Sequence, residues 1–208
     1  MTEHEPLKAR LQELAERHWD LSAIESRFKS LVEEGLSKGA IPRDEMITRK
    51  EEILDRIQRR GEEYCYLTRN CARGSATALF EAFGLGTMEM IKALAPFPGL
   101  GMTGGICGPV TGGLMTIGLY FAVDDLTDYQ DPRPYLAARK FLNRFETALG
   151  SLLCPGIQEF ILGKYFDPMA SQENLEAFNR AHAREKCPLA PGLGARIAAQ
   201  VIIEDMEE

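Results

Sequence analysis

Five cysteines are the residues of this sequence with the widest range of possible chemistry. A cysteine thiolate attacks disulfides and binds metal ions, so a group of cysteines indicates redox exchange or a metal centre. The five lack the paired C-x-x-C spacing of a zinc ribbon, and no C-x-x-C-H sequence for haem attachment occurs. Any site that they share must therefore be assembled by the tertiary fold. They are Cys65, Cys71, Cys107, Cys154 and Cys187.

The residues next to the cysteines predict that most of them stand at helix starts. Three are followed closely by proline, in Cys107-Gly108-Pro109, Cys154-Pro155 and Cys187-Pro188. Proline favours the first position of a helix, where unpaired amides and the positive end of the dipole stabilise a thiolate. Cys71 follows Asn70, a residue type that caps helices, although a helix continuing from residue 62 would weaken this interpretation.

Four sulfurs directed from separate helix ends toward one point would form a pocket that favours anionic ligands. Glycines beside Cys107, notably Gly105 and Gly108, would let the backbone approach a cofactor and donate N–H groups to its sulfurs. The alternative for each cysteine is simple packing, because a free cysteine often behaves as a small buried hydrophobe. Packing is the favoured interpretation of Cys65, which lies between two tyrosines.

The cysteines and their surroundings resemble the C_GCAxxG_C_C family of redox-active proteins. The family's central motif reads Cys-Gly-Ala-x-x-Gly, and here Pro109 replaces the alanine while both glycines are kept. The resemblance covers about Gly61 to Met206. It is carried by Asn70-Cys71-Ala72, by Cys107-Gly108-Pro109-Val110-Thr111-Gly112, by Phe145 through Gly150-Ser151-Leu152-Leu153-Cys154, and by Cys187-Pro188.

The resemblance implies that four cysteines work together, and domains of this type are found joined to haem-bearing electron carriers. It suggests an iron–sulfur cluster, the expected cofactor, with a redox partner protein; four thiolates are the usual ligands of such clusters. The ligands and the cofactor-binding glycines would then be Cys71, Cys107, Cys154, Cys187, Gly105 and Gly108.

Three other functions stay open at this point. Two of the four cysteines would cycle between thiol and disulfide in a metal-free redox protein. A structural zinc site or a plain helical interaction protein is the non-catalytic alternative. An enzyme for a small substrate would use the glycine-rich residues 100–113 to line its pocket, although no acid–base residue stands out.

Helical periodicity dominates the chain and predicts an all-α fold. Residues 5–34 and about 44–60 read as two amphipathic helices, which favour an antiparallel hairpin that packs on the protein or forms a homo-oligomer. We therefore divide the chain into this hairpin, 1–60, and a four-cysteine redox domain, 61–208. The domain is expected to be a multi-helix bundle, with a glycine-rich loop before a central buried helix. Its helices are predicted at about 62–83, 87–95, 109–123, 132–149, 155–164, 171–185 and 188–206.

Composition and charge indicate which partners and which cellular compartment to expect. The 208 residues carry 24 basic and 31 acidic side chains, a net charge of −7, which argues against nucleic acid as a partner. The charged N-terminus has no signal-peptide core, so we expect a cytoplasmic protein with reduced thiols. Ala93 to Val123 is uncharged, but prolines and glycines leave only Val110–Val123 as continuous helix. That is shorter than the roughly 20 residues that a transmembrane span needs.

Overall fold

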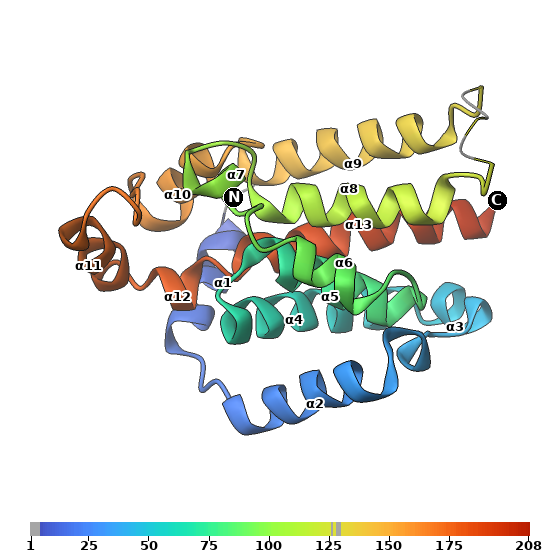
Figure 1. The fold of residues 1–208 in the computed structure, drawn as a ribbon, viewed down its shortest axis with the longest axis horizontal. Helices are drawn as coiled ribbons and strands as arrows, with labels where there is room; N and C mark the ends of the chain where they lie inside the picture. The colour runs from blue at the N-terminus through green and yellow to red at the C-terminus, as the bar shows by residue number, and fades with distance from the viewer. Residues whose placement is uncertain (1–4, 126, 128–129) are drawn as a thin grey trace.

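The computed structural model describes residues 5–125, 127 and 130–208, and it shows a bundle of helices (Figure 1). In this part of the chain no strand occurs, and the β-type pairing is limited to a single antiparallel bridge between Ile106 and Leu153. The predicted all-α class is therefore confirmed. The helices are α1 (Glu5–Glu16), α2 (Leu21–Glu34), the 3₁₀-helix η1 (Leu36–Gly39), α3 (Arg43–Thr48), α4 (Lys50–Thr68), α5 (Cys71–Phe83), α6 (Met88–Ala93), α7 (Gly99–Met102), α8 (Gly108–Phe121), α9 (Arg133–Leu149), α10 (Cys154–Leu162), α11 (Gln172–Arg180), α12 (Ala183–Lys186) and α13 (Leu189–Glu207).

Five long helices form the core of the bundle. The C-terminal helix α13 packs against α4, α5, α8 and α9, so it runs through the centre of the bundle (Figure 1). Helix α8 is the predicted central helix, and its Val110 and Ile117 are almost completely buried. The glycine-rich segment that precedes it, from Gly99 to Gly105, contains the short turn α7. No described helix has both the length and the apolar character required to cross a membrane.

Close contact between α5 and α8 depends on a glycine at the crossing point. A Cβ atom on Gly112 of α8 would lie 2.3 Å from Oγ of Ser75 and 2.8 Å from the carbonyl oxygen of Ala72, both on α5. Any larger residue there would push the two helices apart. The glycine thereby brings the first turn of α5, which carries Cys71, beside the first turn of α8.

The N-terminal helices begin and end at other residues than predicted. The helix expected over 5–34 is two helices, because Asp20 caps α2 by accepting a 3.0 Å hydrogen bond from the Ala23 amide. The break expected near residue 60 is absent, and α4 continues to Thr68. The helix predicted over 171–185 is also divided, because His182 takes a left-handed conformation with φ of 57°. The domain division at residue 60 stays a prediction.

The N-terminal arm, α1 to α3, packs on the bundle of its own chain. Its apolar residues Leu14, Ile24 and Leu31 are buried there.

Two buried glutamates of the bundle bind arginines of the arm. Glu62 of α4 accepts hydrogen bonds from Arg10 and Arg17 of the arm, at 2.7 and 2.8 Å. Glu81 of α5 binds Arg27 of α2 and accepts a 2.6 Å hydrogen bond from the Tyr64 hydroxyl. Homodimer formation through this arm stays a prediction.

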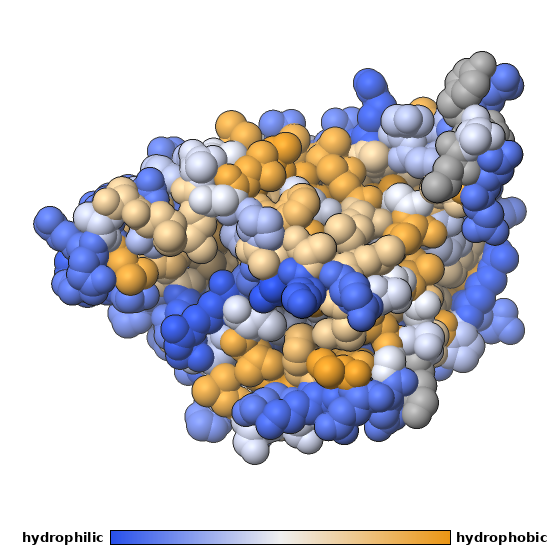
Figure 2. Space-filling model, in the orientation of Figure 1, coloured by the Kyte–Doolittle hydropathy of each residue, from blue (hydrophilic) through white to orange (hydrophobic). Residues whose placement is uncertain are grey.

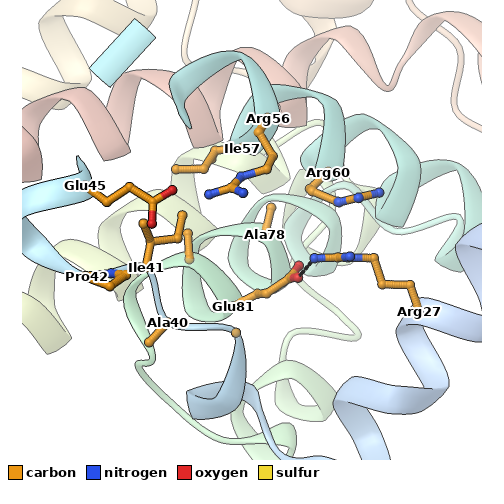
Figure 3. Close-up of a pocket in the computed structure, with 12 residues that line it drawn as sticks. Arg27, Ala40, Ile41, Pro42, Glu45, Arg56, Ile57, Arg60, Ala78 and Glu81 are labelled. Carbon is orange, nitrogen blue, oxygen red and sulfur yellow. Dashed lines mark hydrogen bonds and ion pairs between the residues drawn. The ribbon is translucent and has the colours of Figure 1, made fainter. Parts of the chain in front are cut away.

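The Arg27–Glu81 ion pair borders a cavity of about 220 Å³ between the arm and the bundle (Figure 3). Arg56 and Arg60 of α4 also line this cavity. A second cavity of about 310 Å³ adjoins the 17–20 link, α2 and α4 and shares Arg27 and Arg60 with the first. No cysteine lines either cavity, so neither of them belongs to the thiol site described below.

Candidate thiol site

Four of the five cysteines stand at the starts of helices, as their neighbours predict. Cys71 is the first residue of α5, Cys107 directly precedes α8, and Cys154 is the first residue of α10. Cys187 follows α12 and lies two residues before the first residue of α13. These four residues therefore lie at or just before the first turn of a helix, and Cys187 also ends α12.

The helix start at Cys71 results from a sharp break after α4. Arg69 takes a left-handed conformation, with φ of 52°, and its amide donates to the carbonyl of Cys65 to close α4. The Asn70 side chain then accepts a 3.0 Å hydrogen bond from the Arg73 amide and caps α5. The helix predicted to run through this point is thus two helices, and Cys71 begins the second.

A short backbone clamp holds Cys107 beside Cys154. The amide of Cys107 donates to the carbonyl of Leu152, and the amide of Cys154 donates to the carbonyl of Gly105, both at 2.9 Å. These two hydrogen bonds enclose the bridge between Ile106 and Leu153. The clamp therefore fixes two segments that are far apart in the sequence, and it carries one cysteine on each.

The Cys107 thiol interacts with the thiols of both Cys154 and Cys71, and these interactions raise its pKa. Gly108 makes room for the second of these contacts, because a Cβ atom there would lie 2.4 Å from Sγ of Cys71. Cys107 is buried, whereas Cys71 and Cys154 are partly exposed. All five cysteines are free thiols. The arrangement thus places one buried thiol between two accessible ones.

A family model described as "Putative redox-active protein (C_GCAxxG_C_C)" matches residues 69–201, which include these four cysteines. The chain belongs to this family. The match begins at the break between α4 and α5, so the N-terminal arm and Cys65 lie outside it. No curated protein and no solved structure matches the chain.

Within the C_GCAxxG_C_C region, Cys154 has the chemistry of a reactive thiolate. The hydrogen bond from the Cys107 thiol lowers the pKa of Cys154 to about 7, against an opposing effect of burial. The side-chain amide of Gln158 adds a second donor, with its Nε2 atom 3.3 Å from Sγ of Cys154. The same hydrogen bonds, to Cys154 and Cys71, raise the pKa of Cys107, and burial adds to this effect.

Gln158 is a site residue that the sequence analysis missed. It lies four residues after Cys154 on α10, so both side chains project from the same face of the helix. Its Oε1 atom accepts a 2.9 Å hydrogen bond from the amide of Phe166, which leaves the Nε2 atom to donate to the sulfur. The sequence signal that could have revealed it is this spacing of four behind a cysteine at a helix start.

The thiols of the other two cysteines, Cys187 and Cys65, are harder to ionise than that of Cys154. Burial raises the pKa of the Cys187 thiol, and negative charge on Cys71 or Cys154 would raise it further. Burial likewise raises the pKa of Cys65, followed by the influence of Cys71 and Cys187. Both groups therefore remain protonated at neutral pH. Neither is poised to attack a disulfide, because the thiolate is the nucleophilic form.

A metal centre requires a tighter arrangement than the described residues provide. Among them, no group of three or more His, Cys, Asp or Glu side chains is placed so that it could hold a metal ion. The predicted N–H donors also have other roles, since the amide of Gly105 donates to the carbonyl of Gly99 at 2.9 Å. The four cysteines as placed therefore do not fit a preformed iron–sulfur site.

Proposed function

We propose that this chain is a thiol–disulfide redox protein whose working pair is Cys107 and Cys154. The observation that carries the proposal is the backbone clamp, which holds the two cysteines side by side so that the Cys107 thiol lowers the pKa of Cys154. A pKa of about 7 makes about half of Cys154 thiolate at neutral pH, whereas an ordinary cysteine with a pKa near 8.5 is only a few per cent ionised. A thiol whose pKa is close to the ambient pH is the best nucleophile for exchange.

The exposure of the two thiols sets the order of the steps. The partly exposed Cys154 thiolate attacks one sulfur of a substrate disulfide, forms a mixed disulfide and releases the first substrate thiolate. Cys107, once deprotonated, attacks the sulfur of Cys154 and releases the second substrate thiolate. The substrate gains two electrons, its two thiolates take up the two protons that the pair has lost, and the protein holds a Cys107–Cys154 disulfide. A dithiol reductant returns the pair to its thiol form by the reverse exchange.

The ionisation of Cys154 gives the first test. Alkylation of Cys154 by iodoacetamide should follow the thiolate, so its rate should rise with pH around a midpoint of about 7. Cys107→Ala removes the main stabilising donor and should move this midpoint upward by about one pH unit or more. Cys65→Ala, which leaves the pair intact, serves as the control and should keep the midpoint. Site-resolved mass spectrometry measures each rate. A midpoint near 8.5 in the unaltered protein, unchanged by Cys107→Ala, would contradict the proposal.

Oxidation gives the second readout of the same proposal. Mild treatment with a small disulfide should yield one intramolecular bond, and peptide mapping should place it between Cys107 and Cys154. Five thiols that stay free, or a bond between two other cysteines, would count against the pair. Cys154→Ser should prevent the bond from forming.

An iron–sulfur cluster on Cys71, Cys107, Cys154 and Cys187 is the second candidate. Its support is that all four cysteines stand at helix starts and that the charges of Cys71 and Cys154 influence both Cys107 and Cys187. The four thiols would have to move closer together to bind it. When bound, a cluster would supply one-electron transfer. A redox partner protein, a cytoplasmic location and a homodimer are further proposals that fit either candidate.

Metal content separates the candidates. Protein purified without oxygen should contain neither iron nor acid-labile sulfide if the working group is the thiol pair. Iron and sulfide in fixed ratio to protein, absent from the Cys187→Ser variant, would replace the pair with a cluster. Stoichiometric zinc without visible colour would instead indicate a structural zinc site, the remaining alternative.

A further inference from the structure

Apolar side chains border the partly exposed Cys154 thiol. Leu153, the residue before it, is 51% exposed, and Leu100 of α7 is 44% exposed. Figure 2 shows hydrophobic side chains gathered over α7 and the adjoining end of α9. Neither leucine belongs to the hydrophobic core cluster of the bundle. We call Leu100 and Leu153 the apolar rim.

The backbone around Leu100 holds its side chain next to the site. Leu100 has a φ of 48°, in the left-handed region that favours glycine, and Met102 has a φ of 60°. The Leu100 side chain lies over Gly105, where an added Cβ atom would be 2.9 Å from Cβ of Leu100. Gly105 in turn accepts the hydrogen bond from the Cys154 amide. Strained non-glycine residues tend to occur at functional sites, because surrounding structure must maintain them.

The turn also brings the chain close to the sulfur itself. A Cβ atom on Gly99, the residue before Leu100, would lie 3.5 Å from Sγ of Cys154. Leu153 approaches from the opposite segment of the clamp, where it pairs with Ile106. One exposed leucine therefore stands on each of the two segments that meet at Cys154.

We propose that the apolar rim determines the substrate specificity of Cys154 and selects disulfides flanked by apolar side chains. The proposal rests on the proposed function, because it concerns the substrate of the same thiolate. Leu100 and Leu153 would bury the residues beside the substrate cysteine while its sulfur meets Cys154. Each methylene that leaves water in a partly exposed apolar contact is worth roughly a fourfold preference, so a few such contacts give a measurable selectivity.

The test compares two neutral peptide disulfides that differ only beside the cysteine. One is the homodisulfide of blocked Leu-Cys-Leu, and the other is the homodisulfide of blocked Ser-Cys-Ser. We expect Cys154 to form the mixed disulfide roughly tenfold faster with the leucine peptide. Leu153→Ser and Leu100→Ser should each reduce this ratio toward one. Stopped-flow kinetics with mass-spectrometric assignment of the product gives both rates.

Two further variants control for effects on folding. Leu136→Ser alters another leucine that is 61% exposed, in the first turn of α9, about 20 Å from the end of α9 that adjoins the clamp. It should keep the full ratio. Leu100→Gly removes the side chain while it relaxes the left-handed backbone, so it should lower the ratio without loss of stability.

The outcomes distinguish the two proposals. Equal rates with both peptides in the unaltered protein, or a ratio that both rim variants preserve, would overturn the specificity and leave the thiol pair intact. A Cys154 that is alkylated by iodoacetamide with a midpoint of about 7 but reacts with neither peptide would overturn the proposed function, and the specificity with it.

Discussion

Gly108→Ala should destabilise the protein by about 2–3 kcal/mol, a typical cost of overpacking a rigid contact. The added methyl would lie 2.4 Å from Sγ of Cys71 and 2.6 Å from the backbone nitrogen of Ala72. A flexible side chain could turn away, but the backbone of α5 cannot. The first turns of α5 and α8 must therefore separate, and Cys71 must leave Cys107. Urea unfolding measures the loss of stability.

Gly118→Ala is the matched control for this substitution. Gly118 lies on the same helix, α8, and a Cβ atom there would meet nothing within 4 Å. Alanine has the higher helix propensity, so this variant should gain about 0.5–1 kcal/mol. The two glycines should thus give opposite signs. A loss of similar size in both variants would show that the effect belongs to the helix and not to the contact with Cys71.

Replacing both Arg10 and Arg17 by glutamine should cost about 3–5 kcal/mol, because it leaves a buried carboxylate without a cation. The side chain of Glu62 is 0% exposed, and these two arginines provide the charge that balances it. For a protein of this size the midpoint of thermal unfolding should fall by roughly 10 °C. Differential scanning calorimetry measures the shift.

The control for the double variant is an ion pair on the surface of the same arm. Lys29 and Glu25 are both largely exposed on α2, so Lys29→Gln should change stability by less than about 0.5 kcal/mol. Limited proteolysis adds a local readout, because a detached α1 should be cleaved in the 17–20 link before the bundle unfolds. Equal thermal midpoints for the double variant and the Lys29→Gln control would refute the balancing role of the two arginines.

Local sequence signals predicted the fold as far as they describe single helices. The Cys-Pro pairs located the starts of α10 and α13, and the prolines and glycines after Ala93 located the loop before α8. The break near Asp20 was not predicted, because apolar residues continue at helical spacing on both sides of it. The break at Arg69 could not be predicted for another reason. The residue in the left-handed conformation is an arginine, whereas glycine is the type that usually marks such a helix end in a sequence.

The four cysteines of the candidate site could be separated from Cys65 by their neighbours alone. The pairing of Cys107 with Cys154 could not, because it depends on two backbone hydrogen bonds between segments 47 residues apart. Hydrogen bonds of this kind leave no periodic pattern, since only one residue of each segment takes part in the bridge. The low pKa of Cys154 follows from this pairing, so it was equally invisible in the sequence.

The region matched by the family model makes stabilising contacts with residues that lie outside it. A fragment limited to residues 69–201 would keep Glu81 but lose its partners Arg27 and Tyr64. It would also lack α4, so the face of α13 that packs on α4 would be exposed. The family region is thus stabilised in part by the helices that precede it in the chain. Transplanting the four-cysteine module into another protein would require α1 to α4 to be carried along with it.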